Sequence, residues 1–197
     1  MKAKLKSATL GLITLLFLSI PDLAIAQTDY QSNNSQVTIK GTSTLHDWEM
    51  TSSKGQTKAS FQIDGNKITA ISGLSFTVPA ESLKSDRAGL DKNAYKALHT
   101  GQYKNIKFDM TSGSVTSLGD NTFEVKAIGN LSIAETVKQT SISATCTFNP
   151  GDKSIQGKGS TTFKMTAYNV KPPTVMLGTI KTGDEITIDY ELKLTAQ

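Results

Sequence analysis

Regular alternation of apolar and polar residues constrains the fold of this 197-residue chain more than any other feature. The clearest alternating stretch is residues 186–194, whose apolar residues are Ile186, Ile188, Tyr190, Leu192 and Leu194. Because successive side chains of a strand point to opposite faces, such a stretch predicts a strand with one apolar face. Stretches 68–78, 122–133 and 140–148 repeat the pattern. On their apolar faces we expect Ile68, Ala70, Leu74, Phe76 and Val78; Phe123, Val125, Ala127, Leu131 and Ile133; and Ile142, Ala144, Cys146 and Phe148.

Less regular stretches raise the expected number of strands to eight or nine; they are residues 36–42, 45–52, 57–63, 105–116 and 155–167. Short turns rich in Gly, Asp and Asn separate several of them, at 64–66, 119–121 and 149–152, and Gly183-Asp184 is expected to open the last strand. Short turns favour an antiparallel meander. A sheet with one apolar face must close into a barrel or fold into a sandwich to bury that face, so the sequence predicts an all-β domain.

One short helix interrupts the strands. Asp91 is the expected N-cap, and Leu90 and Tyr95 stand at the spacing of a hydrophobic staple. Gly101 is the expected stop.

A second irregular segment contains Pro172 and Pro173, which cannot donate to a sheet ladder, so residues 170–174 are a loop or an edge. The apolar Val175, Met176, Leu177 and Ile180 follow. So much apolar surface in a loop predicts a lid over an apolar ligand.

Residues 1–26 have the pattern of an export signal, with three lysines, an apolar run over 8–20, and Ala24-Ile25-Ala26 as a cleavage site. The run is shorter than the roughly 20 residues that cross a bilayer. We therefore expect cleavage after Ala26, a periplasmic or secreted protein, and one mature domain, residues 27–197, without a transmembrane segment. The leader carries three lysines and one aspartate, so its removal lowers the formal net charge from +4 to +2. With Arg87 as the only arginine, no nucleic-acid partner is expected.

The single cysteine excludes an internal disulfide and a cysteine-rich zinc site. Cys146 shares the Phe148 face, which predicts a buried, inert thiol. A metal site would need Cys146 and the only two histidines, His46 and His99, to converge from remote positions. No metalloprotease, nucleophile-elbow, P-loop or dinucleotide-binding motif occurs. We expect no catalytic residues, no metal and no cofactor.

Three stretches, in this order along the chain, resemble one known family. They are Gly-Thr-Ser-Thr-Leu-His-Asp-Trp at 41–48, the expected helix at 90–98 followed by 103–108, and Lys-Pro-Pro-Thr-Val-Met-Leu-Gly at 171–178 with Thr-Gly-Asp at 182–184. On these residues the chain is similar to the YceI-like family, bacterial periplasmic polyisoprenoid-binding proteins. Asn93 stands where members of the family often have an apolar residue.

The resemblance implies a single antiparallel lipocalin-like barrel of about eight strands with one short helix. It also implies a non-covalently held isoprenoid, isoprenoid quinone or similar long-chain amphiphile, and roles in lipid handling and stress tolerance. The residues expected to bind this ligand are the aromatic and long apolar side chains of the barrel, the helix and the proline loop, with one histidine: His46, Trp48, Phe76, Tyr95, Leu98, Phe108, Met110, Phe123, Leu131, Phe163, Met165, Tyr168, Met176 and Leu177.

The residues alone leave several alternatives open. An eight-stranded barrel is at the size where side chains fill the interior or leave room for one ligand. Trp48 either stacks on a ligand or plugs one barrel end. His46 is a base oriented by Asp47, a contact for a ligand headgroup, or a structural hydrogen-bonding group; adjacent strand residues point to opposite faces, which disfavours the catalytic pair. The leading hypothesis is a non-enzymatic lipid binder. An isomerase or hydrolase using His46 and Asp47, a packed interaction module, and a homodimer remain alternatives.

Overall fold

The computed structural model describes residues 27–197, and the expected export signal, residues 1–26, lies outside the described residues. The strands are β1 (Gln27–Ser43), β2 (Trp48–Asp64), β3 (Lys67–Pro79), β4 (Asn105–Gly119), β5 (Thr122–Ile133), β6 (Thr136–Asn149), β7 (Ser154–Lys164), β8 (Thr174–Val175) and β9 (Ile180–Ala196). The helices are α1 (Ala88–Ala97) and three 3₁₀ turns, η1 (Ala80–Ser82), η2 (Met165–Tyr168) and η3 (Met176–Gly178). No helix in the described part of the chain is long and apolar enough to cross a membrane.

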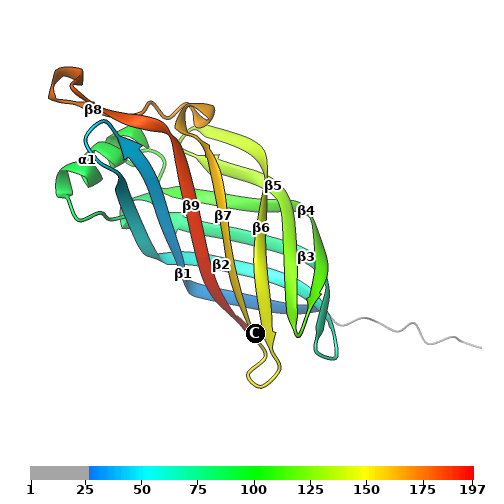
Figure 1. Ribbon diagram of the computed structural model, residues 1–197. Coiled ribbons are helices and arrows are strands. Elements are labelled where there is room, and N and C mark those ends of the chain that lie inside the picture. The colour runs from blue at the N-terminus through cyan, green and yellow to red at the C-terminus, as the bar shows by residue number, and fades with distance from the viewer. Residues whose placement is uncertain (1–26) are drawn as a thin grey trace, which may run out of the picture.

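Eight strands form a closed antiparallel barrel (Figure 1). Strands β1 to β7 each pair with the next, β7 pairs with β9, and β9 pairs back with β1. The two-residue β8 only adds to the start of β9, through Thr174 and Lys181. Closure removes the free edges of the sheet, so the predicted lipocalin-like barrel with one α-helix is confirmed.

The strands are longer than the alternating pattern suggested. The predicted strands 45–52 and 57–63 are one strand, β2, because a shift in register opposite Ser35 absorbs the polar residues between them. Gly55 sits at that shift, where a Cβ would lie 2.6 Å from the Ser35 carbonyl oxygen. The last strand begins at Ile180 and not at Gly183.

A second register shift corrects the predicted apolar face of β3. The β2–β3 pairing slips between Gln62 and Ile63, next to Ala70. Since a one-residue slip reverses which face a side chain occupies, Ile71 is buried in place of Ala70.

Helix α1 begins four residues earlier than predicted, with Arg87 and not Asp91 at the N-cap. Asp91 lies inside the first turn, where it is buried. At the other end His99 adopts a left-handed conformation (φ 53°), and the Thr100 N–H donates to the Tyr95 carbonyl oxygen at 3.1 Å. The stop is therefore a Schellman motif at His99, two residues before the predicted Gly101.

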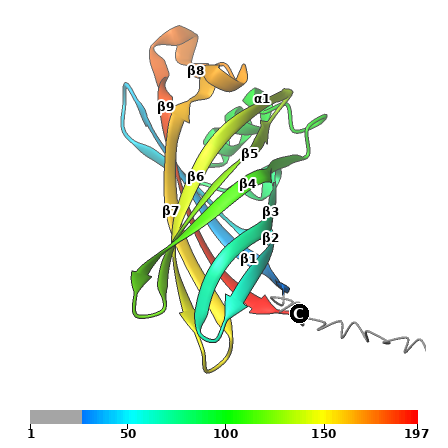
Figure 2. The ribbon, with the colours of Figure 1, turned by 90° about the vertical axis from the view of Figure 1, so that its right-hand side faces the viewer.

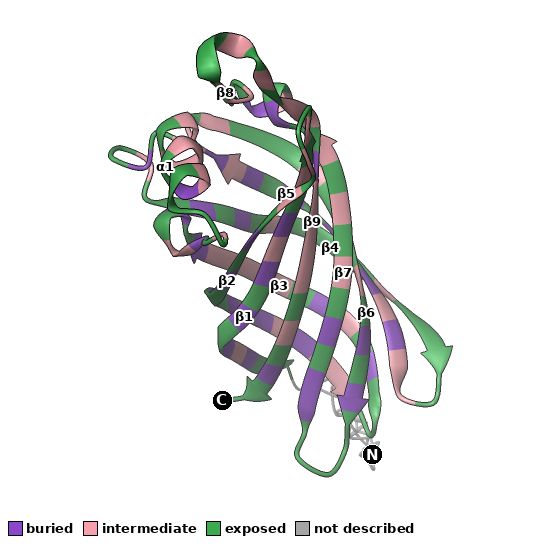
Figure 3. Cartoon of the chain, turned by 60° about the vertical axis from the view of Figure 1, so that its left-hand side comes forward, coloured by how far each residue is buried: buried purple, intermediate pink, exposed green. Residues whose placement is uncertain are grey.

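The buried residues form two clusters, one at each end of the barrel (Figure 3). The end opposite α1, which also holds the C-terminus, is closed by Phe123, Ile155 and Leu194, each at most 2% exposed (Figure 1). The other end is covered by α1 and by the loops before β2 and β9. This arrangement places any internal space at the α1 end.

Candidate ligand-binding site

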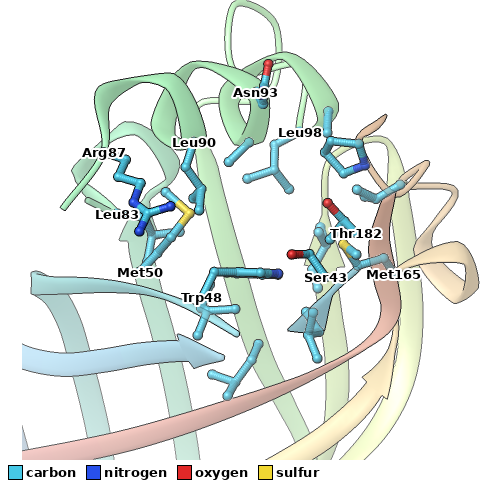
Figure 4. A pocket seen from close by; sticks show the side chains of 18 of the residues that line it. Ser43, Trp48, Met50, Leu83, Arg87, Leu90, Asn93, Leu98, Met165 and Thr182 are labelled. Atoms are coloured by element: carbon cyan, nitrogen blue, oxygen red, sulfur yellow. The ribbon is translucent and has the colours of Figure 1, made fainter. Parts of the chain in front are cut away.

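The α1 end of the barrel encloses a cavity of about 260 Å³, here called the mouth cavity (Figure 4). Its walls come from the barrel strands, its cover from α1 and its rim from the loops before β2 and β9. Most of its lining is aliphatic or aromatic, and it comprises Ile39, Ser43, Leu45, His46, Trp48, Met50, Leu83, Arg87, Leu90, Asn93, Ala94, Ala97, Leu98, Ile106, Ile133, Phe163, Met165, Tyr168, Val170, Pro173, Val175, Ile180, Thr182, Ile186 and Ile188.

A second cavity, of about 120 Å³, lies deeper in the barrel and is here called the inner cavity. Ile39, Ile106 and Ile188 line both spaces, so the two adjoin. The combined volume of the two cavities exceeds roughly 300 Å³, the lower end of the volumes typical of small-molecule pockets. Their succession along the barrel axis suits an elongated molecule better than a round one.

Four of the polar residues that line the inner cavity are hydrogen-bonded in two pairs. The hydroxyls of Ser35 and Thr57 lie 2.7 Å apart, and both residues are buried. The Tyr190 hydroxyl donates to the Ser143 carbonyl oxygen at 2.7 Å, and burial raises the pKa of Tyr190 to about 12. Because these groups satisfy each other, the inner cavity offers a guest an essentially apolar surface.

The cavities exist because the barrel wall is wider near α1. The β6–β7 ladder runs only from Asn149–Ser154 to Ala144–Gly159, and the strands then diverge toward the α1 end (Figure 2). Tyr190 on β9 reaches across the divergence to β6. Only a glycine at 159 permits this, since a Cβ there would lie 2.4 Å from the Tyr190 ring.

The rim of the mouth cavity carries one cationic group, Arg87, in contact with Nε2 of His46. The other ring nitrogen, Nδ1, lies 2.6 Å from the Asp47 backbone oxygen. A carbonyl oxygen only accepts and a guanidinium only donates, so in these contacts Nδ1 acts as the donor and Nε2 as the acceptor. Both ring nitrogens are therefore engaged, and His46 does not meet the Asp47 carboxylate.

These rim residues separate an apolar space from a polar one. His46, Trp48, Arg87 and Leu90 line the mouth cavity and also a polar groove on the outside of the barrel. The Trp48 indole N–H donates to the Thr42 carbonyl oxygen at 3.0 Å, which fixes the ring against Gly41. An amphiphile with its chain inside would place its polar end at this boundary.

Helix α1 is anchored over the mouth by partly buried hydrogen bonds. The Asp91 carboxylate accepts from the Ser85 N–H at 2.8 Å and from the Ser85 hydroxyl at 2.7 Å. Burial acts to raise the pKa of Asp91, but these hydrogen bonds and Lys84 outweigh it and hold that pKa below its usual value. The Tyr95 hydroxyl donates to the Leu83 carbonyl oxygen at 2.6 Å. Leu90 and Leu98 of this anchored segment then face the cavity.

Nine of the fourteen residues expected to bind the ligand line the cavities. Six line the mouth cavity: His46, Trp48, Leu98, Phe163, Met165 and Tyr168. Three line the inner cavity: Phe76, Phe108 and Leu131.

The other five line neither cavity. Tyr95 anchors α1, Met110 packs between the two buried clusters, and Phe123 lies in the packed closed end. Met176 and Leu177 point into solvent, 71% and 108% exposed. In the predicted lid it is Val175 and Ile180 that line the mouth.

Sequence reasoning missed several residues of the mouth, notably Arg87, Asn93 and Thr182. Arg87 had a signal, since it is the only arginine of the chain and directly precedes the helix. Asn93 also had one, as the polar residue at a usually apolar helix position. Thr182 stands in the Thr-Gly-Asp stretch at 182–184 that carries part of the family resemblance, but that stretch was interpreted only as the start of the last strand.

Among the described residues, no group of three or more His, Cys, Asp or Glu side chains is arranged to hold a metal ion. Cys146 is buried in the closed end, which raises the pKa of its thiol to about 11. Its low thiolate fraction at neutral pH makes it a poor nucleophile.

Comparison with protein families decides the affiliation of the chain. The model of the YceI-like domain matches residues 29–194, which is nearly the whole described barrel. The chain belongs to the YceI-like family. A comparison with curated protein sequences gave no match.

Solved structures of the YceI-like fold are similar over most of their length. BcnA of Burkholderia cenocepacia superposes with a TM-score of 0.63 at 17% identity, covering 82% of this chain and 96% of its own. A polyisoprenoid-binding domain from Saccharophagus degradans, implicated in plant cell wall breakdown, gives 0.62 at 9% identity, covering 87% and 100%. The Campylobacter jejuni YceI protein gives 0.53 at 16% identity, covering 73% and 84%. At these identities the likeness concerns the fold.

Proposed function

We propose that this protein is a non-enzymatic binder and carrier of a long-chain apolar lipid, in the periplasm or outside the cell. The ligand class is a polyisoprenoid, an isoprenoid quinone or a similar amphiphile. The observation that carries the proposal is the succession of two adjoining apolar cavities, about 260 and 120 Å³, between a polar rim and a packed closed end. Family membership and the polyisoprenoid-binding neighbour from Saccharophagus degradans support the same ligand class.

The binding mode follows from the lining. Burial of an apolar chain contributes roughly 25 cal/mol per Å² removed from water, so the cavities supply the free energy of binding. The polar end of the ligand lies at the rim beside Arg87, His46 and Ser43. With a single cation there, binding should depend only weakly on ionic strength.

A binding role is favoured over catalysis by the state of His46. Its two ring nitrogens are both occupied, by Arg87 and by the Asp47 backbone, which leaves no free basic nitrogen facing the cavity. The described lining of the mouth cavity contains no cysteine and no carboxylate that could act as a nucleophile or base.

The test is native purification of the exported protein, extraction with organic solvent, and mass spectrometry of the extract. A stoichiometric long-chain lipid is expected. Phe163→Asp, which places a charge in the mouth cavity, should lose the lipid. Thr145→Asp, on the exposed outer face of β6, is the control for added charge. Wild-type protein that is folded, carries no lipid and takes up none from lipid dispersions would refute the proposal.

A further inference from the structure

Three exposed apolar side chains gather at the open end of the barrel, beyond the mouth cavity. They are Leu45 in the loop between β1 and β2, 64% exposed, and Met176 and Leu177 in the hairpin between β8 and β9, 71% and 108% exposed. We call these three residues the apolar tip. The hairpin projects past the rim of the barrel (Figure 1).

The two loops of the apolar tip are fastened to each other. The Thr44 N–H donates to the Lys181 carbonyl oxygen at 3.0 Å, and the Lys181 N–H donates to the Thr44 hydroxyl at 3.1 Å. Thr179, next to the hairpin turn, also accepts from the Thr44 hydroxyl at 3.4 Å. Leu45 and the hairpin therefore form one surface on a fixed base.

The two apolar residues at the turn of the hairpin have an unfavourable backbone conformation. Met176 and Leu177 both have positive φ, 51° and 55°, which disfavours residues that carry a Cβ. Glycine or asparagine would suit these positions better, and neither side chain packs into the barrel. Local stability therefore does not account for a methionine and a leucine here, whereas contact with something outside the chain does.

The shape of the apolar tip fits a bilayer better than a protein. A stable protein interface buries about 800 Å² on each partner, which three side chains on two narrow loops do not provide. A soft lipid surface accepts a few inserted side chains.

The surroundings of the apolar tip also suit a membrane. The hairpin side of the tip, residues 169–183, contains two exposed lysines, Lys171 and Lys181, and no acidic residue, which complements anionic headgroups. The carboxylate of the following Asp184 accepts hydrogen bonds from Thr166, and Asp47 is the one acidic residue of the β1–β2 loop. The same loops line the mouth cavity through Leu45, Val175 and Ile180. Apolar surface is therefore continuous from the tip into the cavity.

We propose that the apolar tip inserts into the surface of a bilayer that contains anionic lipid and holds the mouth cavity against it. Docking gives a lipid cargo a path from membrane to cavity that avoids water. The purpose of docking rests on the proposed lipid-binding function, but docking itself requires no cargo.

The experiment is flotation of the mature protein with vesicles of three parts phosphatidylethanolamine to one part phosphatidylglycerol. The test variant is Leu177→Glu. The matched control is Leu118→Glu, which changes a 57% exposed leucine near the β4–β5 turn, at the closed end. If the substitution removes the burial of apolar area equal to two methylene groups, the affinity for the vesicles falls by about tenfold. We expect at least that loss for Leu177→Glu and wild-type binding for Leu118→Glu.

A second variant tests the charge argument. Lys171→Glu combined with Lys181→Glu should weaken flotation with the anionic vesicles and have little effect with pure phosphatidylcholine vesicles. Both lysines are exposed, so the fold should be kept, and unchanged thermal melting verifies this.

Equal flotation of Leu177→Glu and Leu118→Glu, or a wild type that does not float, would overturn the docking proposal. A wild-type dimer that Leu177→Glu dissociates, without any vesicle binding, would also overturn it and assign the tip to a second copy. Lipid extraction from the same preparations separates the two proposals. Protein that carries lipid but ignores vesicles contradicts docking alone, and protein that floats but never carries lipid contradicts the carrier function alone.

Discussion

A larger side chain that fills the inner cavity should reduce the amount of bound lipid and raise the stability of the lipid-free protein. Ala127 lines the inner cavity and is 1% exposed, so Ala127→Leu adds three carbons to a space of about 120 Å³. At about 0.8 kcal/mol per buried methylene, the gain is at most ~2.4 kcal/mol. The free-energy cost of an empty cavity, about 24 cal/mol per Å³, amounts to ~3 kcal/mol for the whole inner cavity, which is similar to the gain estimated from the added carbons. A domain of this length should then melt up to roughly 5–10 °C higher.

The matched control is the same substitution in the packed closed end. Ala59 is 3% exposed and belongs to the buried cluster there, so Ala59→Leu should destabilise the protein by about 1–3 kcal/mol through overpacking. Bound lipid itself stabilises the folded state, so melting is compared on delipidated protein. Lipid content is measured on native preparations of the same variants. If Ala127→Leu is destabilised as much as Ala59→Leu, the inner cavity is not available space and the reasoning fails.

Three further outcomes are expected. Intact-mass analysis of exported protein should find Gln27 as the first residue, and a mature form that retains the leader would contradict the predicted cleavage site. Cys146 should react slowly with thiol reagents at neutral pH, because burial raises its pKa to about 11, and reducing agents should leave melting unchanged; fast labelling of native protein would contradict this. Since the Asp91 pKa is lowered in the fold, its contribution to stability is complete above the unfolded value of about 3.9 and is lost as pH falls through the lower folded value. Asp91→Asn should flatten this acid loss in melting temperature measured against pH, and an unchanged profile would contradict the anchoring role of Asp91.

The barrel could be predicted from the sequence because its signal is local and repeated. In β5 every residue of the predicted apolar face, from Phe123 to Ile133, is buried. The prediction of strand bounds and inward-facing residues failed where pairing with a neighbouring strand interrupts the two-residue alternation. The register slip beside Ala70 rotates Ile71 inward, and the shift opposite Ser35 joins two predicted strands into β2. Such slips depend on the partner strand, which alternation along one stretch does not report.

The candidate site was predicted less well, because alternation marks which side chains point inward but not at what height in the barrel they lie. Phe123 and Phe108 look equivalent in the sequence, yet Phe123 packs the closed end and Phe108 lines the inner cavity. The proline loop misled in another way. Its apolar residues were expected to share one role, but Val175 faces the mouth while Leu177 faces solvent, since the left-handed turn at 176–177 reverses the chain between them.

The same strands form a packed end that stabilises the barrel and a wider end that contains the cavities. At the closed end β6 and β7 are paired, and large side chains such as Phe148 and Ile155 meet across the pair. Beyond Gly159 the ladder stops, and Tyr190 bridges the divergence by donating to the Ser143 carbonyl oxygen. Gly157 and Gly159 would weaken an ordinary strand, because they give β7 no side chains with which to pack the interior. In this barrel the absent side chain at 159 lets Tyr190 reach β6 across the divergence, so a residue that weakens an ordinary strand is required at the wider, cavity-containing end.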